Sequence, residues 1–184
     1  TLNRAYQSHR QPGSSIKPLI VYTPFFEKGN TPETLVSDTE IEGGPDMSYY
    51  HGEVTARFAV QQSLNPAAWN VYSQITPEVG LQYLKNMHFK EIKDKDYVLA
   101  TSLGGFTRGA SAVEMASAYA TIENDGVYRE PTCIKKIVDS AENIVYMSNQ
   151  EGTKIYTETA ARMMTEVLQS TVTDGISWVA AIDG

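Results

Sequence analysis

The stretch Arg10-Gln11-Pro12-Gly13-Ser14-Ser15-Ile16-Lys17-Pro18 predicts a sharp turn that leads straight into a helix. Pro12-Gly13 is a pair of residues typical of turns and helix breaks. Pro18 has no backbone N–H to donate, so a helix tolerates it only near its first turn, where donors are unpaired anyway. The helix is therefore predicted to begin close to Ser14, and the apolar residues 19–21 are expected to carry it into a core.

Within this stretch, Ser14 and Lys17 have the types and the spacing of a nucleophile and its base. At a helix N-terminus, free N–H groups and the macrodipole favour developing negative charge. Lys17 lies three residues after Ser14, so both side chains are expected on one helical face. A lysine can take the serine proton once burial or another cation lowers its pKa. A bare Ser-x-x-Lys pattern arises by chance about once in a chain of this size, and it equally describes a polar helix start with a solvated lysine.

Size and composition indicate one ordinary globular domain. The chain has 184 residues, of which 41% are hydrophobic and 20% charged. The net charge of -7 argues against binding to nucleic acid, which needs a basic patch. Cys133 is the only cysteine, which excludes an internal disulfide, and its apolar neighbours predict a small buried residue. His9, His51 and His88 lack the spacing of a metal site.

Turn and cap signals predict a chain rich in helices. One helical stripe ends near Pro66, and a second begins there. Thr76-Pro77-Glu78 predicts the start of the next helix, with Thr76 as its N-cap. Ser111 and Glu114 form a capping box for a helix through Ile122, and a last helix is expected to begin near Thr157.

Strand signals are fewer. Residues 134–138 and 144–147 are predicted to form two strands joined by a turn. Residues 28–50 are predicted to be a long ordered loop, with an extended piece over residues 34–37. The glycine-rich segment 103–109 fits either close backbone packing or a place in the lining of a substrate cleft.

Ser63-Leu64-Asn65 is the second candidate element, because it falls between two predicted helices. A serine hydroxyl there can relay a proton between Lys17 and a leaving group, and the Asn65 amide can bind a substrate carbonyl. The alternative is that Asn65 simply caps the next helix.

Three separated segments together resemble class A penicillin-binding proteins. The first is the quoted stretch over residues 10–18, and its Ser-x-x-Lys pattern is known from penicillin-binding proteins and β-lactamases. The second, Ala59-Val60-Gln61-Gln62-Ser63-Leu64-Asn65, resembles the Ser-x-Asn segment of that family. The third, residues 114–128, resembles the helix that follows it. The three matches occur in family order and cover most of the chain.

The resemblance implies an α+β fold like that of β-lactamases and DD-transpeptidases, with residues 1–184 as a partial transpeptidase domain. It implies a serine DD-transpeptidase that acts on peptidoglycan stem peptides ending in D-Ala-D-Ala and is acylated by β-lactam antibiotics. Ser14 would be the nucleophile, Lys17 the base, Ser63 the proton relay and Asn65 the group that binds the substrate amide. No metal or organic cofactor is implied. A glycosyltransferase domain is expected upstream, and the protein is expected at the outer face of the bacterial cytoplasmic membrane.

One departure from the family pattern predicts a fragment. The family's Lys-Thr-Gly or Lys-Ser-Gly strand is absent, and residues 180–184 stand about where the family leads into it. That strand would supply half of the oxyanion hole, so activity of this piece alone is in question. Part of the antiparallel sheet is expected to be missing. The helices beginning at Ser14, Ser111 and Thr157 are then expected to present uncovered apolar faces.

Two other functions remain open at this stage. A non-catalytic module, either a penicilloyl-binding sensor or a scaffold, would share the same segments. The combination of Ser14, Lys17, Ser63 and Asn65 favours catalysis, since a scaffold has no use for all four. A β-lactamase would need a deacylating water and its base, and no segment recommends itself for that role.

Overall fold

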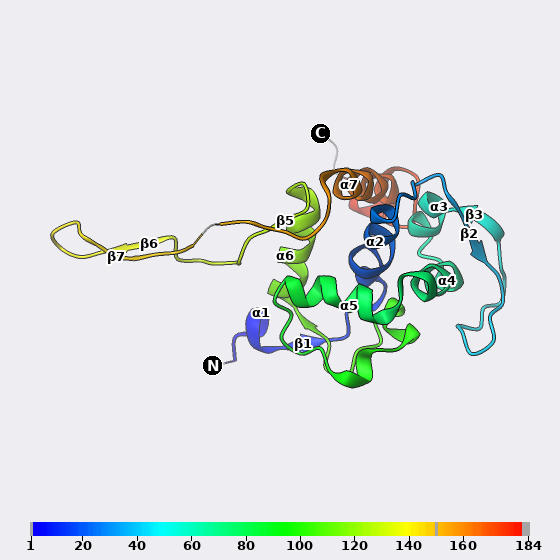
Figure 1. The fold of residues 1–184 in the computed structure, drawn as a ribbon, viewed down its shortest axis with the longest axis horizontal. Coiled ribbons are helices and arrows are strands. Elements are labelled where there is room, and N and C mark those ends of the chain that lie inside the picture. Colours follow the sequence, from blue (N-terminus) through cyan, green and yellow to red (C-terminus); the bar gives the residue numbers. More distant parts are fainter. Residues whose placement is uncertain (1, 150, 182–184) are drawn as a thin grey trace.

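The computed structural model describes residues 2–149 and 151–181 as a helical body with one long β-hairpin projecting from it (Figure 1). The α-helices are α1 (Arg4–Gln7), α2 (Thr23–Glu27), α3 (Ala56–Gln61), α4 (Asn65–Ile75), α5 (Pro77–Asn86), α6 (Ala112–Glu123) and α7 (Glu158–Thr173). The strands are β1 (His9–Arg10), β2 (Leu35–Asp38), β3 (Gly52–Thr55), β4 (Ala110–Ser111), β5 (Val127–Tyr128), β6 (Lys136–Val138), β7 (Ile144–Met147) and β8 (Thr153–Lys154). Short 3-10 turns cover Asp94–Asp96, Leu99–Leu103 and Trp178–Ala180.

One continuous helical segment runs through the middle of the body (Figure 1). It begins as a 3-10 helix over Gly13–Ile16, continues as a π-helix over Pro18–Tyr22 and ends as α2. The prediction that a helix begins close to Ser14 is therefore confirmed. Its residues 16–26 are all buried, so the expectation of an uncovered apolar face on this helix is wrong. A π-turn is rare and is frequently found at functional sites, and here it follows directly after Lys17.

The other helices surround this segment largely as their sequence signals predict. The apolar positions of α4, Ala67, Ala68, Val71 and Ile75, are fully buried. The capping box of α6 is present, and the Thr157 hydroxyl caps α7 by accepting from the Ala160 N–H at 3.3 Å. The predicted side-chain cap at Thr76 is wrong: Thr76 precedes α5, but its φ is 76° and its side chain makes no cap hydrogen bond.

Four antiparallel pairs make up the β structure: β1 with β4, β2 with β3, β5 with β8 and β6 with β7. The predicted pair β6–β7 is confirmed, whereas the other three pairs were not predicted. Strands β1, β4, β5 and β8 have two residues each, too few for an alternating pattern. The segment 28–50, predicted to be a loop with an extended piece over residues 34–37, contains β2 at Leu35–Asp38, so the extended piece is confirmed to within one residue. Within the described ranges no sheet exceeds two strands, which agrees with a helix-rich chain. Residues 182–184, part of the predicted approach to a further strand, lie outside those ranges.

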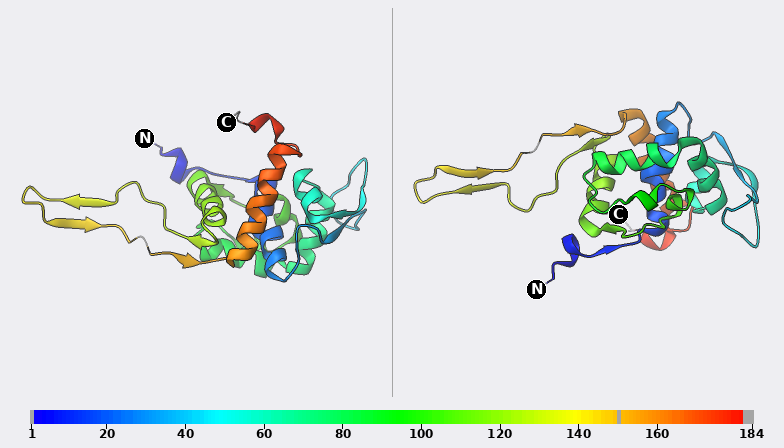
Figure 2. Two further views of the ribbon diagram at one scale, coloured as in Figure 1. Left: turned by 90° about the horizontal axis from the view of Figure 1, so that it is seen from above. Right: turned by 60° about the horizontal axis from the view of Figure 1, so that its bottom comes forward.

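The β6–β7 hairpin, here called the arm, extends away from the body on the side opposite β2–β3 (Figures 1 and 2). All of its residues are exposed, including Val145 at 67%. Cys133 lies in the segment that leads into the arm and is exposed, so the prediction of a buried cysteine is wrong. An open groove runs between α6 and α7, and its apolar lining includes Tyr119, Ile122, Leu168 and Val172. The large apolar side chains of these two helices are buried or half-buried, so the expectation of large uncovered apolar faces on them is wrong.

Candidate active site

The amine of Lys17 is the centre of the candidate site. Lys17 is 3% exposed, and its Nζ lies 2.7 Å from the Ser63 carbonyl oxygen and 2.7 Å from Asn65 Oδ1. Ser63 Oγ is 3.2 Å away, and the Leu64 carbonyl oxygen is 3.4 Å away. An ammonium group has three N–H donors, so these oxygens satisfy it. The structure thus brings three of the four predicted site residues into direct contact.

Ser63 faces Lys17 because of how α3 ends. The Leu64 N–H donates to the Ala59 carbonyl at 2.9 Å, and the Ser63 N–H donates to the Val60 carbonyl at 3.0 Å. This is the Schellman pattern, in which the residue after the cap adopts the left-handed conformation and is usually glycine. Ser63 adopts it with φ 53°, at a cost of order 1 kcal/mol. The sequence therefore places a strained serine, rather than an unstrained glycine, against the buried amine.

Asn65 is the first residue of α4, and Leu64 occupies the N-cap position. The Asn65 side chain makes no cap hydrogen bond, because its Oδ1 accepts from Lys17 Nζ instead. The interpretation of Asn65 as a simple helix cap is therefore wrong. With Oδ1 directed at Lys17, the two N–H groups of the amide are left as donors for another acceptor.

Ser14 lies in the 3-10 turn that leads to Lys17 and is exposed. In a 3-10 helix, side chains three residues apart lie one above the other, and the Lys17 N–H donates to the Ser14 carbonyl. Ser14 and Lys17 therefore share a face, as predicted. Among the described residues no group makes a hydrogen bond with the Ser14 hydroxyl. The structure places Ser14 one turn from the Lys17 cluster, at the surface, without a direct side-chain bond to it.

The glycine-rich segment 103–109 supports the turn before Ser14. A Cβ on Gly104 would lie 2.3 Å from the Gly13 backbone nitrogen, and one on Gly109 would lie 2.1 Å from the Arg10 carbonyl oxygen. Only glycine permits such an approach. Gln11 Nε2 also donates to the Phe106 carbonyl at 3.2 Å. The interpretation of this segment as close backbone packing is confirmed.

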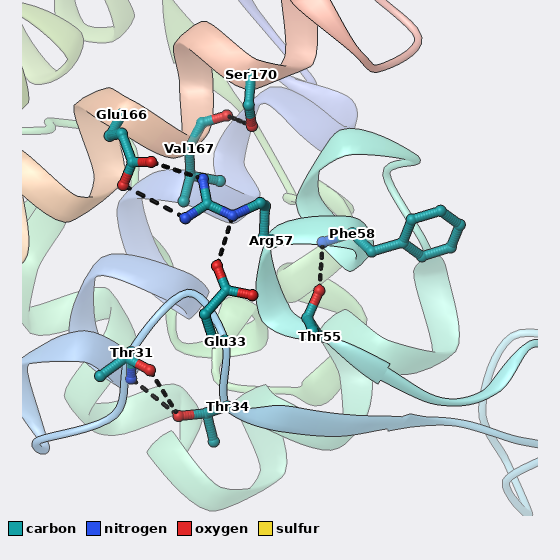
Figure 3. A network of polar contacts seen from close by, with 9 residues as sticks. All are labelled: Thr31, Glu33, Thr34, Thr55, Arg57, Phe58, Glu166, Val167 and Ser170. Carbon is teal, nitrogen blue, oxygen red and sulfur yellow. Dashed lines mark hydrogen bonds and ion pairs between the residues drawn. The ribbon is translucent and has the colours of Figure 1, made fainter.

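Arg57 connects α3, the helix that leads to Ser63, with two other parts of the body (Figure 3). Its Nε lies 2.7 Å from Glu33 Oε1, and its Nη1 lies 2.9 Å from Glu166 Oε1 on α7. Hydrogen bonds from Glu166 and then Glu33 raise the pKa of the guanidinium. Both carboxylates are more than half exposed, so each pair contributes at most about 1 kcal/mol. The contacts fix the position of α3 more than they stabilise the fold.

Electrostatics make Lys17 a weaker base than a free lysine. Burial lowers the pKa of Lys17 to about 8, and the charge of Asp38 acts in the opposite direction. Asp38, the last residue of β2, is 2% exposed and was missed by the sequence reasoning. The predicted extended piece stopped at residue 37. One more residue of strand would have placed Asp38 on the same inward face as Val36.

In the described part of the chain, no three His, Cys, Asp or Glu side chains are grouped so that they could hold a metal ion. In the same part, every helix is too short or too polar to cross a membrane.

Comparison with known proteins identifies relatives along the whole chain. The family model of the penicillin binding protein transpeptidase domain matches residues 1–184. The chain is 32% identical over 179 residues to penicillin-binding protein 4 of Bacillus subtilis (strain 168). It is 36% identical over 174 residues to penicillin-binding protein 1F of the same organism. These matches cover 94% and 90% of this chain but only 29% and 24% of the two relatives.

A solved structure shows the same fold. The crystal structure of the D,D-transpeptidase domain of a peptidoglycan glycosyltransferase from Eggerthella lenta superposes with a TM-score of 0.82 at 19% identity. The match covers 100% of this chain and 53% of that one. The predicted fold class, like that of β-lactamases and DD-transpeptidases, is therefore confirmed.

Proposed function

Because the chain belongs to the transpeptidase-domain family of penicillin-binding proteins, we propose that it holds the acylation site of a serine DD-transpeptidase. The observation that carries this proposal is the buried amine of Lys17, bonded by Ser63 and Asn65 and one helical turn from the exposed Ser14. The substrate class is the peptidoglycan stem peptide ending in D-Ala-D-Ala, and β-lactam antibiotics acylate the same serine.

In the proposed reaction, Ser14 Oγ attacks the carbonyl carbon of the penultimate D-Ala while Lys17 Nζ takes the hydroxyl proton. The bond from that carbon to the nitrogen of the terminal D-Ala then breaks, and the leaving amine receives a proton through Ser63 Oγ, 3.2 Å from Lys17 Nζ. An acyl ester on Ser14 remains. The amine of a second stem peptide attacks this ester and forms the cross-link, and Ser14 regains its proton.

The neutral form of Lys17 is the one that acts as base. It has two N–H groups and a lone pair, so it can donate to the Ser63 carbonyl and Asn65 Oδ1 while its lone pair faces a hydroxyl. The amide N–H groups of Asn65 then donate to a substrate carbonyl. Each of the four residues has one task in this scheme.

The whole protein is proposed to carry more than this domain. A glycosyltransferase domain upstream and action at the outer face of the bacterial cytoplasmic membrane follow from the class A resemblance. Half of the oxyanion hole would come from the family's Lys-Thr-Gly or Lys-Ser-Gly strand, and these 184 residues contain neither triplet. The activity is therefore proposed for the whole protein.

Labelled penicillin and peptide mapping test the proposal on the whole protein. The label is expected on Ser14, and Ser14→Ala should abolish labelling. Ser15→Ala is the matched control, because Ser15 is the exposed neighbour whose hydroxyl only bonds the Pro12 carbonyl at 2.7 Å. A label on Ser63, or none, would contradict the assignment. Release of D-Ala from a pentapeptide separates an enzyme from a penicilloyl-binding sensor, which would bind without turnover.

A further inference from the structure

Two prolines interrupt the hydrogen-bond ladder of the helical segment in the middle of the body, here called the central segment. In a 3-10 helix each carbonyl accepts from the N–H three residues later, and for Ser15 that residue is Pro18. In a π-helix the partner lies five residues later, and for Leu19 that residue is Pro24. Proline has no N–H to donate. The carbonyls of Ser15 and Leu19, one on each side of Lys17, therefore lack these regular partners.

Two tyrosine hydroxyls from distant parts of the chain bond these carbonyls instead. Tyr119 Oη, on α6, donates to the Ser15 carbonyl oxygen at 2.8 Å. Tyr156 Oη, two residues before α7, donates to the Leu19 carbonyl oxygen at 2.7 Å. Burial raises the pKa of Tyr119 to about 12 and that of Tyr156 well above its ordinary value, so both phenols keep the donated proton at neutral pH. The two contacts supply from outside what the prolines remove.

The two contacts differ in their surroundings. The contact of Tyr156 with Leu19 is buried, and Tyr156 itself is 1% exposed. Tyr119 is half-buried, and its contact with Ser15 lies at the surface. Ser15 directly follows the exposed Ser14. Tyr119 therefore bonds the part of the central segment that carries the proposed nucleophile, whereas Tyr156 bonds a part inside the core.

The position of Ser14 depends on the backbone more than that of Lys17 does. The Lys17 amine is fixed by four oxygen atoms within 3.4 Å. The Ser14 hydroxyl makes no hydrogen bond with a described residue, so its distance from Lys17 is set by the 3-10 turn between them. Hydrogen bonds in such a turn have poorer geometry than those of an α-helix. A contact from another helix to the Ser15 carbonyl, in the middle of this turn, is therefore a means of fixing it.

We propose that Tyr119 is a positioning residue for Ser14: its hydroxyl holds the Ser15 carbonyl and keeps the 3-10 turn in the conformation that presents Ser14 Oγ to Lys17. This inference rests on the proposed function. In this role Tyr119 takes no part in proton transfer and acts only through the backbone.

Tyr119→Phe in the whole protein tests the inference, because it removes the hydroxyl and keeps the ring. The rate of acylation at saturating labelled penicillin should fall about tenfold, less than the roughly 100-fold cost of a 1 Å misplacement. The penicillin concentration that gives half of the maximal rate should stay close to the wild-type value, and so should the final amount of label per protein. A variant damaged only in its fold shows less final label but an unchanged rate in the labelled fraction, and that result overturns the inference.

Tyr156→Phe is the matched control, because it removes the same group from the other carbonyl. It leaves the Leu19 carbonyl buried without its donor, so the urea midpoint of unfolding should fall. Its acylation rate should stay close to wild type. Tyr119→Phe should show the reverse, since water can reach the Ser15 carbonyl and keep the urea midpoint nearly unchanged.

A rate that falls in proportion to stability in both variants would make both tyrosines merely structural and would overturn the inference. Tyr83→Phe replaces Tyr156→Phe if that variant does not fold, since the Tyr83 hydroxyl donates to a side chain, Glu27 Oε2, at 3.2 Å.

The pH profile of acylation distinguishes positioning from proton transfer. Tyr119→Phe should lower the rate by the same factor at every pH, because Lys17 remains the group that titrates. A profile that moves along the pH axis would make Tyr119 a proton carrier and would overturn the inference.

Amide hydrogen exchange, followed by NMR, separates this inference from the proposed function because it needs no acylation. The Lys17 N–H donates to the Ser14 carbonyl and so reports on the closure of the turn. Its exchange should be faster in Tyr119→Phe than in the wild type, because a turn near the surface exchanges through local opening. Equal exchange overturns the inference. A wild type that takes no penicillin overturns the proposed function, while faster exchange in Tyr119→Phe would still show that Tyr119 holds the turn.

Discussion

Lys17 and the arm both break the rule that polar groups lie outside and apolar groups inside, and they break it for different reasons. Lys17 is 3% exposed, and four oxygen atoms lie within 3.4 Å of its amine. In the arm, Val145 is 67% exposed, and every other residue of the arm is exposed as well. The buried amine is held by specific contacts. The exposed valine belongs to a two-stranded ribbon, and within residues 2–149 and 151–181 no second layer covers it.

Around Lys17 the backbone departs from the conformation that the local sequence prefers. At Ser63 a left-handed backbone carries a serine, and next to Lys17 the helix takes a π-turn. In the arm, Asp139 Oδ1 accepts from the N–H groups of Ala141 and Asn143 at 2.8 and 2.9 Å and builds the turn, in which Glu142 also has a left-handed backbone with φ 65°. Conflict between local preference and observed conformation is expected at functional sites. Substitutions near Lys17 should therefore change chemistry, whereas substitutions in the arm should change little.

The largest expected effect is the loss of acylation in Lys17→Arg. Arginine fits the charge but does not lose its proton in a protein, so it cannot take the proton of Ser14. The rate of labelling by penicillin should fall by about 100-fold or more, the usual contribution of a general base. Lys28→Arg is the control, since Lys28 is exposed and its amine only bonds the Gln74 carbonyl at 2.8 Å. If Lys17→Arg retained acylation within about tenfold, equal to 1.4 kcal/mol of barrier, Lys17 would not be the base.

A second prediction compares Ser63→Gly with Ser63→Ala. Both variants remove the hydroxyl that lies 3.2 Å from Lys17 Nζ, so both should slow acylation by about 100-fold if that hydroxyl relays the proton. Only glycine relieves the φ of 53° at this position. Ser63→Gly should therefore unfold with a free energy about 1 kcal/mol higher than Ser63→Ala, measured by urea denaturation. Equal stabilities would show that the left-handed backbone stores no strain there.

The sequence predicted the parts of the fold that depend on local signals. The capping box at Ser111 and Glu114 and the cap at Thr157 have side chains that bond their own helix ends. The start of the central helix is marked instead by Pro12-Gly13 and Pro18. The two segments of the candidate site were predicted from short patterns as well, Ser-x-x-Lys at residues 14–17 and Ser-x-Asn at residues 63–65. Thr76 shows the limit, because its sequence fits an N-cap although its backbone conformation does not.

The features that were missed depend on contacts between distant segments. Strand β2 is defined by its pairing with β3, from Leu35 opposite Thr55 to Asp38 opposite Gly52. No residue near Asp38 in the sequence indicates that this segment pairs with residues 52–55. The burial of Asp38 follows from this pairing and was missed with it. Cys133 was predicted to be buried from its apolar neighbours, but the chain leaves the body there. A local pattern cannot tell an apolar strand in a core from one in a projecting ribbon.

The smallest expected effect is in the arm. Val145→Ala and Val167→Ala remove the same two methyl groups, from a side chain that is 67% exposed and from one that is 0% exposed in α7. The buried substitution should lower the free energy of unfolding by about 2 kcal/mol, since it removes transfer free energy and leaves a cavity. The exposed one should change it by less than about 0.5 kcal/mol.

Urea denaturation of both variants beside the wild type gives the two differences. The same pair also sharpens the comparison between body and arm. If the whole protein folds another segment against the arm, Val145 is buried there and Val145→Ala should approach the cost of Val167→Ala. Equal costs would therefore show that the apolar residues of the arm are covered in the whole protein, and a difference of about 1.5 kcal/mol would show that they remain in water.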